Sequence, residues 1–181
     1  MTFEVPEGTD AERLQYTPNS GFDSDTGQWD LTSGESSSPT AQLSPGDAGV
    51  GTAVEIETFD TTIEVSVTEV VDPAPPAEFS DPQPGNRLAA IQIEITNTGS
   101  IVYEDVPDSA AFVVDTDGFQ FRASFLETDA GPGFGGSVDL PPGDSRVGFL
   151  VFEVPDGSTL VKLQISADSG FSEDFAEFDL G

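Results

Sequence analysis

The sequence contains no cysteine and no histidine. Without cysteine the chain can form neither a disulfide nor a thiolate site. Without histidine it lacks the usual general base and the most common metal ligand. Nucleophilic catalysis by serine needs a base beside the hydroxyl, so this composition argues against an enzyme. The single lysine, Lys162, alternates with Val161 and Leu163 in a predicted strand, and we expect it to face solvent.

Basic residues are few and scattered, whereas acidic residues are abundant. Lys and Arg number 5 against 34 Asp and Glu, which gives a formal net charge of -29. Binding to nucleic acid needs clustered Lys and Arg that neutralise phosphates, so the sequence predicts no nucleic-acid partner. Anionic membrane surfaces are excluded for the same reason. No run approaches the roughly 20 apolar residues of a membrane-spanning helix, and no basic-then-apolar signal sequence follows Met1, so membrane insertion is not predicted.

An internal repeat relates the two ends of the chain. Residues 3–31 align without a gap on residues 152–180, an offset of 152 − 3 = 149, and thirteen positions are identical. Average residue usage would give roughly two identities by chance. Residues 1–32 are therefore interpreted as a partial repeat, a copy of the domain's C-terminal segment. Residues 33–46 have the Ser, Pro and Gly composition of a linker, and residues 47–181 form the predicted domain.

Residues 47–181 have the pattern of an all-β domain. Ile63, Val65 and Val67 alternate with polar residues, as in a half-buried strand. Strands are predicted at residues 51–59, 62–71, 87–96, 111–115, 119–125, 146–154, 160–165 and 175–180. Seven or eight strands without helical periodicity predict an immunoglobulin-like antiparallel β-sandwich, and a barrel is the lesser alternative.

Two features beside the predicted central strand allow more than one interpretation. The Pro-rich segment 72–85 is interpreted as a stiff connection between strands, although it could also present polyproline to a partner. Arg87, at the start of that strand, either faces solvent or forms a buried ion pair. The sequence alone does not choose between these two environments.

Three motifs carry a resemblance to a known family. They are RLAAIQIEITNTG at residues 87–99, FVVDTDG at residues 112–118 and LPPGDSRVGFLVFEVP at residues 140–155. Over residues 50–180 the chain resembles an immunoglobulin-like domain of unknown function in secreted actinobacterial and archaeal proteins and lipoproteins. That domain is related to the fold of a secreted mycobacterial immunogenic protein. The resemblance implies an extracellular or cell-surface location and no established catalytic residues.

Four acidic residues are candidate metal ligands: Asp23, Asp25, Asp115 and Asp117. Each pair has alternate carboxylates near glycine, and calcium takes several oxygen ligands of this kind. Neither pair has the spacing of an EF-hand loop, and Asp and Gly are also ordinary turn residues. Calcium therefore stands as the alternative to having no cofactor. A glycoside hydrolase with two carboxylates is a more remote alternative.

The predicted function is a non-catalytic extracellular or cell-surface module for binding or structure, one unit of a tandem protein. A calcium-stabilised or cation-sensing domain is the alternative. The partial repeat contains Leu14, Tyr16 and Trp29, apolar residues that a complete domain would bury. A lone hairpin is marginal in water, so we expect disorder, packing on the same chain, or self-association by strand addition.

We expect the melting temperature to rise with NaCl. Two carboxylates about 10 Å apart repel by about 0.4 kcal/mol in water, and about 1 M salt shortens the Debye length to about 3 Å. Thermal unfolding followed by circular dichroism from low to molar NaCl measures the effect. A melting temperature that is unchanged over this range would contradict the expectation.

Overall fold

The computed structural model describes residues 13–16, 27–30, 48–171 and 175–181, with side chains described from residue 48 onward. The chain divides into two units, Met1–Ser44 and Pro45–Gly181. In the first unit, β1 (Arg13–Tyr16) pairs antiparallel with β2 (Gly27–Asp30). The rest of the predicted partial repeat and the predicted linker at 33–46 lie outside the described residues.

The described residues of the second unit are all β apart from two short 3-10 helices. All eight predicted strands are present, together with three further strands of two or three residues, so the predicted count of seven or eight was too low. In chain order the elements are β3 (Ala48–Gly49), β4 (Ala53–Glu57), β5 (Thr62–Ala74), β6 (Asn86–Asn97), β7 (Tyr103–Asp105), η2 (Pro107–Ala110), β8 (Ala111–Asp115), β9 (Gln120–Ser124), β10 (Val138–Leu140), β11 (Ser145–Pro155), β12 (Leu160–Ser166), η3 (Asp168–Gly170) and β13 (Phe175–Asp179).

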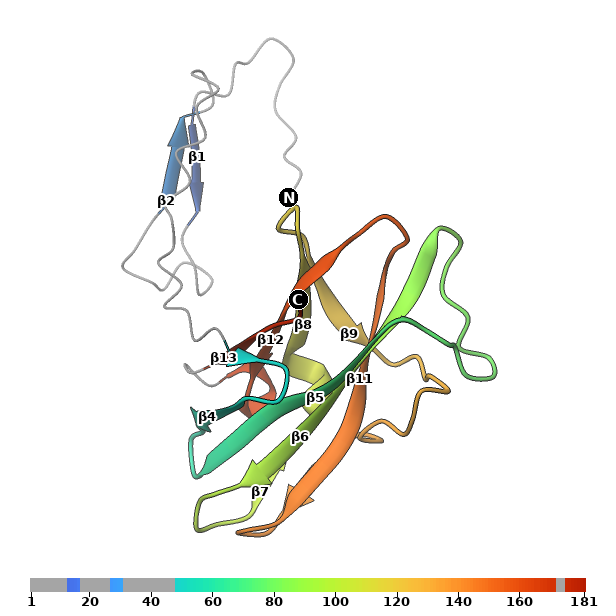
Figure 1. Cartoon of the computed structure of the whole chain (residues 1–181). Helices are drawn as coiled ribbons and strands as arrows, with labels where there is room; N and C mark the ends of the chain where they lie inside the picture. The colour runs from blue at the N-terminus through green and yellow to red at the C-terminus, as the bar shows by residue number, and fades with distance from the viewer. Residues whose placement is uncertain (1–12, 17–26, 31–47, 172–174) are drawn as a thin grey trace. The chain divides into compact units, whose positions relative to one another are not determined.

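Nine strands form one sheet that folds over itself into two layers. Their order is β3-β13-β12-β8-β9-β11-β6-β5-β4, and β7 pairs separately with β10. β9 pairs with β8 along one part of its length and with β11 at its end, where Ser124 lies opposite Val151. The strand thus passes from one layer to the other, as corner strands of sandwiches do. Figure 1 shows β5, β6 and β11 in one layer with β8, β12 and β13 behind them.

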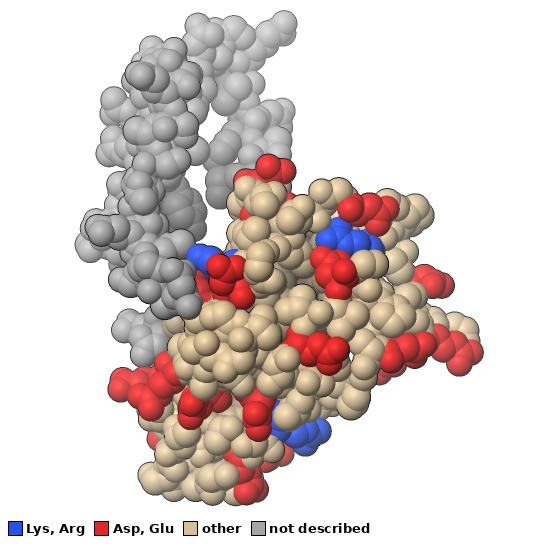
Figure 2. All heavy atoms as spheres, viewed as in Figure 1, with Lys and Arg blue, Asp and Glu red and all other residues tan. Residues whose placement is uncertain are grey.

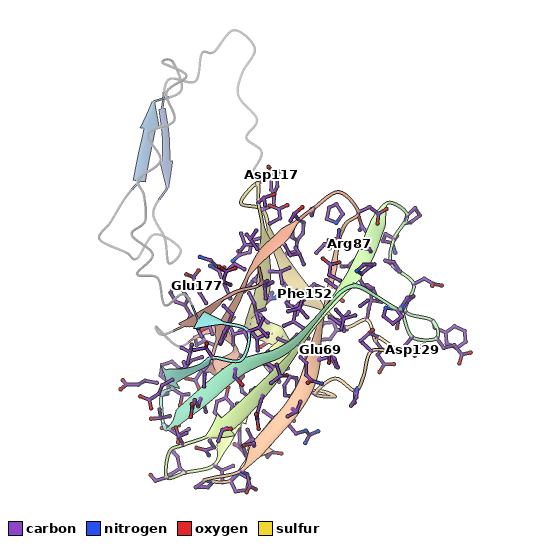
Figure 3. The ribbon with its side chains drawn as sticks, viewed as in Figure 1. Glu69, Arg87, Asp117, Asp129, Phe152 and Glu177 are labelled. Atoms are coloured by element: carbon purple, nitrogen blue, oxygen red, sulfur yellow. The ribbon has the colours of Figure 1, made fainter. Side chains whose placement is uncertain are left out.

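The main core lies between the two layers. Ile63, Val65 and Val67 point inward and are at most 1% exposed, which confirms the alternation predicted for this strand. Phe152 of β11 is fully buried among them and lies at the centre of the sandwich in Figure 3. Burying an aromatic or branched apolar side chain stabilises a fold by about 1.5–3 kcal/mol. The strands with the strongest sequence pattern therefore supply this core.

A second, smaller core lies on the outer face of the β5–β6–β11 layer. It contains Leu88, Ala90, Phe149 and Val151, with Leu126 packed against it. These residues belong to strands whose other face already lines the main core, so the middle of β6 and of β11 is buried on both faces. A loop from residue 125 to residue 136 covers this outer face, and the strands here lose their simple alternation.

A buried asparagine joins three segments at one end of the sandwich. Asn97 is fully buried, and its side-chain Nδ2 donates to the carbonyl oxygens of Ile101, at 2.6 Å, and Leu140, at 2.7 Å. Its Oδ1 accepts from Gly99 N, at 3.0 Å, and from Thr61 Oγ1, at 3.3 Å. Every hydrogen-bonding position of the amide is thus occupied.

The turn that follows Asn97 has room only for glycine. A Cβ atom on Gly99 would lie 1.8 Å from Thr61 Oγ1 and 2.8 Å from Thr62 N. The backbone of Asn97 also bonds to the turn before β11, because its N–H donates to Asp144 O and its carbonyl accepts from Gly143 N. Two of the motifs that carry the family resemblance, residues 87–99 and 140–155, are therefore in contact.

Arg87 forms an ion pair rather than facing solvent freely. Its Nε and Nη2 donate to both carboxylate oxygens of Asp72, at 2.6 and 2.7 Å, and its remaining bonds reach Pro155 O and Ser158 O. The hydrogen bonds to Asp72 raise the pKa of the guanidinium. Such two-point pairing is the stronger form of ion pair. Arg87 thus attaches Asp72, near the end of β5, to the turn between β11 and β12. The Pro-rich segment begins at this end of β5.

Replacing Asn97 by alanine should destabilise the domain by about 3 kcal/mol, because the buried Leu140 carbonyl, the partly buried Ile101 carbonyl and two donors lose their partner. Unfolding in guanidinium chloride measures the difference. The matched control is Thr98→Ala, an exposed neighbour whose hydroxyl donates only to Thr62 O, and it should change stability by about 0.5 kcal/mol or less. A loss below about 1 kcal/mol for Asn97→Ala would show that the amide is not essential.

Candidate functional site

The carboxylate of the predicted ligand Asp115 forms hydrogen bonds within its own turn. It is 4% exposed, and its Oδ1 accepts from the backbone N–H groups of Asp117, at 3.0 Å, and Phe119, at 2.8 Å. Gly118 has a φ of 82°, a conformation that favours glycine. The carboxylate therefore holds the β8–β9 turn closed, and the pattern Asp115-Thr116-Asp117-Gly118 is a hairpin turn, as its residue types indicate.

The other predicted ligands do not join Asp115 in a described cluster. Asp117 lies at the tip of the β8–β9 turn in Figure 3, well apart from the labelled Asp129 on the loop after β9. Asp23 and Asp25 lie outside the described residues. Within the part of the chain that the structure describes, no three His, Cys, Asp or Glu side chains are placed to hold a metal ion. Calcium binding at Asp115 and Asp117 stays a prediction.

A buried polar network that the sequence analysis did not identify connects β7 with η3. The Tyr103 hydroxyl donates to Asp105 Oδ2 at 2.6 Å, and Asp105 Oδ1 accepts from Ser169 N and Ser169 Oγ at 2.8 and 2.7 Å. Tyr103 is 3% exposed and Asp105 is 7% exposed. Burial, followed by the bond to Asp105, raises the pKa of the Tyr103 hydroxyl. The Tyr103 hydroxyl and both oxygens of Asp105 thus have hydrogen-bond partners, and these bonds attach η3 to β7.

Each described Lys or Arg side chain has a hydrogen-bond or ion-pair partner. Lys162 Nζ lies 3.2 Å from Glu177 Oε2, a pairing that the expectation of a solvent-facing lysine did not include. Arg122 donates to Ser109 O and lies over the ring of Phe112, 5.5 Å from its centroid. Arg87 pairs with Asp72 as described above, and Arg146 donates to a loop carbonyl. On the face seen in Figure 2, acidic side chains are scattered over the described surface and basic side chains form only small areas.

A surface hollow of about 780 Å³ lies beside the loop that follows β9. It is lined by loop residues 125–129 and 131–136, by Ala77, by Asp108 of η2 and by Phe149 and Val151 of β11. Its volume falls within the range of small-molecule sites. This feature, here called the loop hollow, is a candidate binding site, and no sequence motif indicated it.

Comparison with known proteins supports the fold and the resemblance. A family model described as "Domain of unknown function (DUF4352)" matches residues 49–176, which confirms the predicted family. None of the structure's described helices is long and apolar enough to cross a membrane. No curated protein matches the chain.

Similar solved structures include the secreted protein MPT63 of Mycobacterium tuberculosis, at 13% identity and a TM-score of 0.51, over 73% of this chain and 95% of that chain. The YjhA protein of Bacillus subtilis is 11% identical with a TM-score of 0.53, over 74% and 99%. The YcdA protein of the same organism is 14% identical with a TM-score of 0.53, over 71% and 38%. At such identities these structures show the fold alone, which agrees with the predicted sandwich.

Replacing Asp115 by alanine should destabilise the domain by about 1–2 kcal/mol, because two turn N–H groups lose their acceptor. Asp115→Asn keeps an acceptor oxygen and should lose less than half as much. Melting temperatures at constant ionic strength, with and without calcium, separate this role from metal binding. A calcium-dependent rise that disappears in both Asp115→Asn and Asp117→Asn would instead establish the calcium alternative.

Proposed function

We propose, because the chain belongs to the DUF4352 family, that it is a non-catalytic binding or structural module that works outside the cell or at its surface. Within that role we place it as one unit of a tandem protein. The extracellular part of the proposal is supported by the secreted MPT63 among the proteins that share its fold. The absence of histidine and cysteine from the sequence supports a role without catalysis.

The tandem arrangement rests on one observation, the register of the two repeated strand pairs. In the first unit Arg13 lies opposite Asp30 and Leu14 opposite Trp29. In the second unit Lys162 lies opposite Asp179 and Leu163 opposite Phe178. Adding the offset of 149 converts the first register into the second at all four pairs of β1 and β2. The repeat thus extends from residue identity to strand pairing.

The substitutions between the repeats fit a sandwich core of the same kind. Ile165 and Ala176, which are opposite one another and buried in the second unit, correspond to Tyr16 and Gly27. A larger residue on one strand thus accompanies a smaller residue on the other, and volume-conserving exchanges are the ones that cores tolerate best. The alternating apolar positions are retained, so β1 and β2 have the pattern of a closing strand pair for another sandwich.

A fusion tests this proposal by supplying the missing strands. Residues 48–151 are joined directly to residue 3 of the full chain, because residue 3 corresponds to residue 152. We expect the fusion to fold as two sandwiches. Trp29 is the only tryptophan and corresponds to the fully buried Phe178, so its fluorescence should shift to shorter wavelength than in the full chain.

The matched control is the fusion with Leu14→Asp, because Leu14 corresponds to Leu163, which is fully buried. It should lose the fluorescence shift while the second sandwich still unfolds cooperatively. Light scattering of the full chain and of a chain beginning at Ser33 tests self-association separately. A fusion whose Trp29 emission matches that of the Leu14→Asp control would contradict the tandem proposal, and a larger mass for the full chain alone would favour strand exchange between molecules.

A further inference from the structure

Three loops at the end of the sandwich that contains Asn97 are bonded to one another. The start of β5 meets the β6–β7 loop, because Gly99 N donates to Thr62 O at 3.0 Å. The β4–β5 turn also meets η3, because Phe59 N donates to Asp168 Oδ2 at 2.9 Å. Figure 1 shows the β4–β5 turn and the β6–β7 loop together at the lower left. This end of the domain thus carries a surface built from segments that are distant in the sequence.

One residue of η3 holds two phenylalanines in place. Asp168 and the following Ser169 have φ values of 52° and 54°, a region that residues other than glycine rarely adopt. The Asp168 carboxylate accepts from Phe59 N, and its carbonyl oxygen accepts from Phe171 N at 3.0 Å. Ser169 in turn donates to the buried Asp105. The strained turn is therefore fixed by the interior of the domain, and strain of this kind is concentrated at binding sites.

Four apolar side chains on these loops are exposed. Phe59 is 69% exposed and Phe171 is 76% exposed, while Ile101 and Val102 are 45% and 49% exposed. These four residues are here called the end patch. The bonds from Asp168 reach only the backbone N–H groups of the two phenylalanines, so those bonds do not depend on the rings. Apolar side chains that gather on one exposed surface mark interaction sites.

The internal repeat retains the turn that presents Phe171. Residues 168–171 read Asp-Ser-Gly-Phe, and residues 19–22, at the offset of 149, read Asn-Ser-Gly-Phe. Asparagine and aspartate adopt positive φ more readily than other residues with a side chain, so the substitution suits the same turn. Burial does not explain why the phenylalanine is retained, because Phe171 is mostly exposed. The repeat thus keeps an aromatic ring that the core does not require.

The end patch lies among acidic residues. The three loops, residues 57–62, 97–105 and 166–171, contain no Lys or Arg. Their acidic residues are Glu57, Asp60, Glu104, Asp105 and Asp168. Arg146, at the start of the neighbouring β11, donates to a carbonyl of the loop after β9. A second copy of this chain, with its net charge of -29, would be repelled, and so would an anionic lipid surface. A basic partner is electrostatically complementary.

We propose that the end patch binds a protein whose surface presents Arg or Lys among apolar side chains. The rings of Phe59 and Phe171 contact the apolar groups, and a guanidinium can lie over a ring while it remains near the acidic loops. Aromatic residues are enriched at the centre of protein interfaces, where charged residues are depleted, and the rim is polar. This inference names a partner class for the binding role proposed above and rests on that role, but it does not need the tandem arrangement.

Titration of the full chain with three synthetic peptides tests the proposal. Calorimetry at one fixed ionic strength compares acetyl-RLRWRL-amide with acetyl-RSRSRS-amide, which has the same charge without apolar groups, and with the acidic acetyl-ELEWEL-amide. We expect the first to bind at least about tenfold more tightly than the second, and the third to bind most weakly. Backbone amide shifts in NMR spectra should concentrate in residues 58–61, 98–102 and 168–171. Equal binding of the two basic peptides would show attraction by charge alone and would overturn the proposal.

Variants of exposed phenylalanines locate the binding surface. Phe59→Ser and Phe171→Ser should each weaken binding of the RLRWRL peptide by about tenfold. Both should leave the melting temperature unchanged, because the bonds to Asp168 use backbone N–H groups. The matched control is Phe79→Ser, since Phe79 is 92% exposed. It follows the other end of β5, whose thirteen residues span about 40 Å, and it should change affinity less than twofold.

The outcomes separate this surface from the broader binding role. If Phe79→Ser weakens binding as much as Phe171→Ser, or if neither patch variant weakens it, the peptide binds elsewhere. The end patch is then not the site, although the module still binds. If the RLRWRL peptide does not bind the unchanged chain, the proposed partner chemistry is wrong. Neither result affects the fusion experiment, which tests the tandem arrangement by itself.

Discussion

The buried amide of Asn97 is the interaction on which one end of the sandwich depends. It ends β6, and it bonds to the carbonyls that precede β7 and end β10. Its backbone also bonds to the turn from which β11 begins. An amide with all its positions filled is costly to displace, because its partners would lose their bonds and the Leu140 carbonyl would remain buried without one. The small β7–β10 sheet therefore keeps a fixed position relative to the central strands, and β7 in turn supplies Tyr103 and Asp105 to the network with η3.

The fold could be predicted from sequence wherever strand patterns were long and regular. Ile63, Val65 and Val67 alternate cleanly because one face of β5 is buried. The pattern was less informative where both faces are covered, as in Leu88–Ile91, and it was absent in β3, β7 and β10, which are too short for alternation. Residues 72–85 were predicted to be a connection, yet β5 continues to Ala74. Proline is tolerated there because β4 pairs only with residues 62–66 of β5, so the end of β5 extends beyond its outer neighbour.

The candidate site was much harder to predict than the fold, because its parts are far apart in the sequence. Asp115 and Asp117 were recognised as a turn, but only the structure shows that the turn uses the carboxylate. Asp105 and Ser169 are separated by 64 residues, and their one sequence signal is the identity of Ser169 with Ser20 in the repeat. The loop hollow depends on Gly131 and Gly148 approaching aromatic rings from other segments, which no local pattern encodes.

The unequal charge composition is compatible with a stable sandwich because the few described cations lie where segments meet. Arg87 joins the end of β5 to the β11–β12 turn, and Lys162 pairs across β12 and β13. The excess acidic residues attract any cation over a distance that salt shortens, so charge alone gives no selectivity.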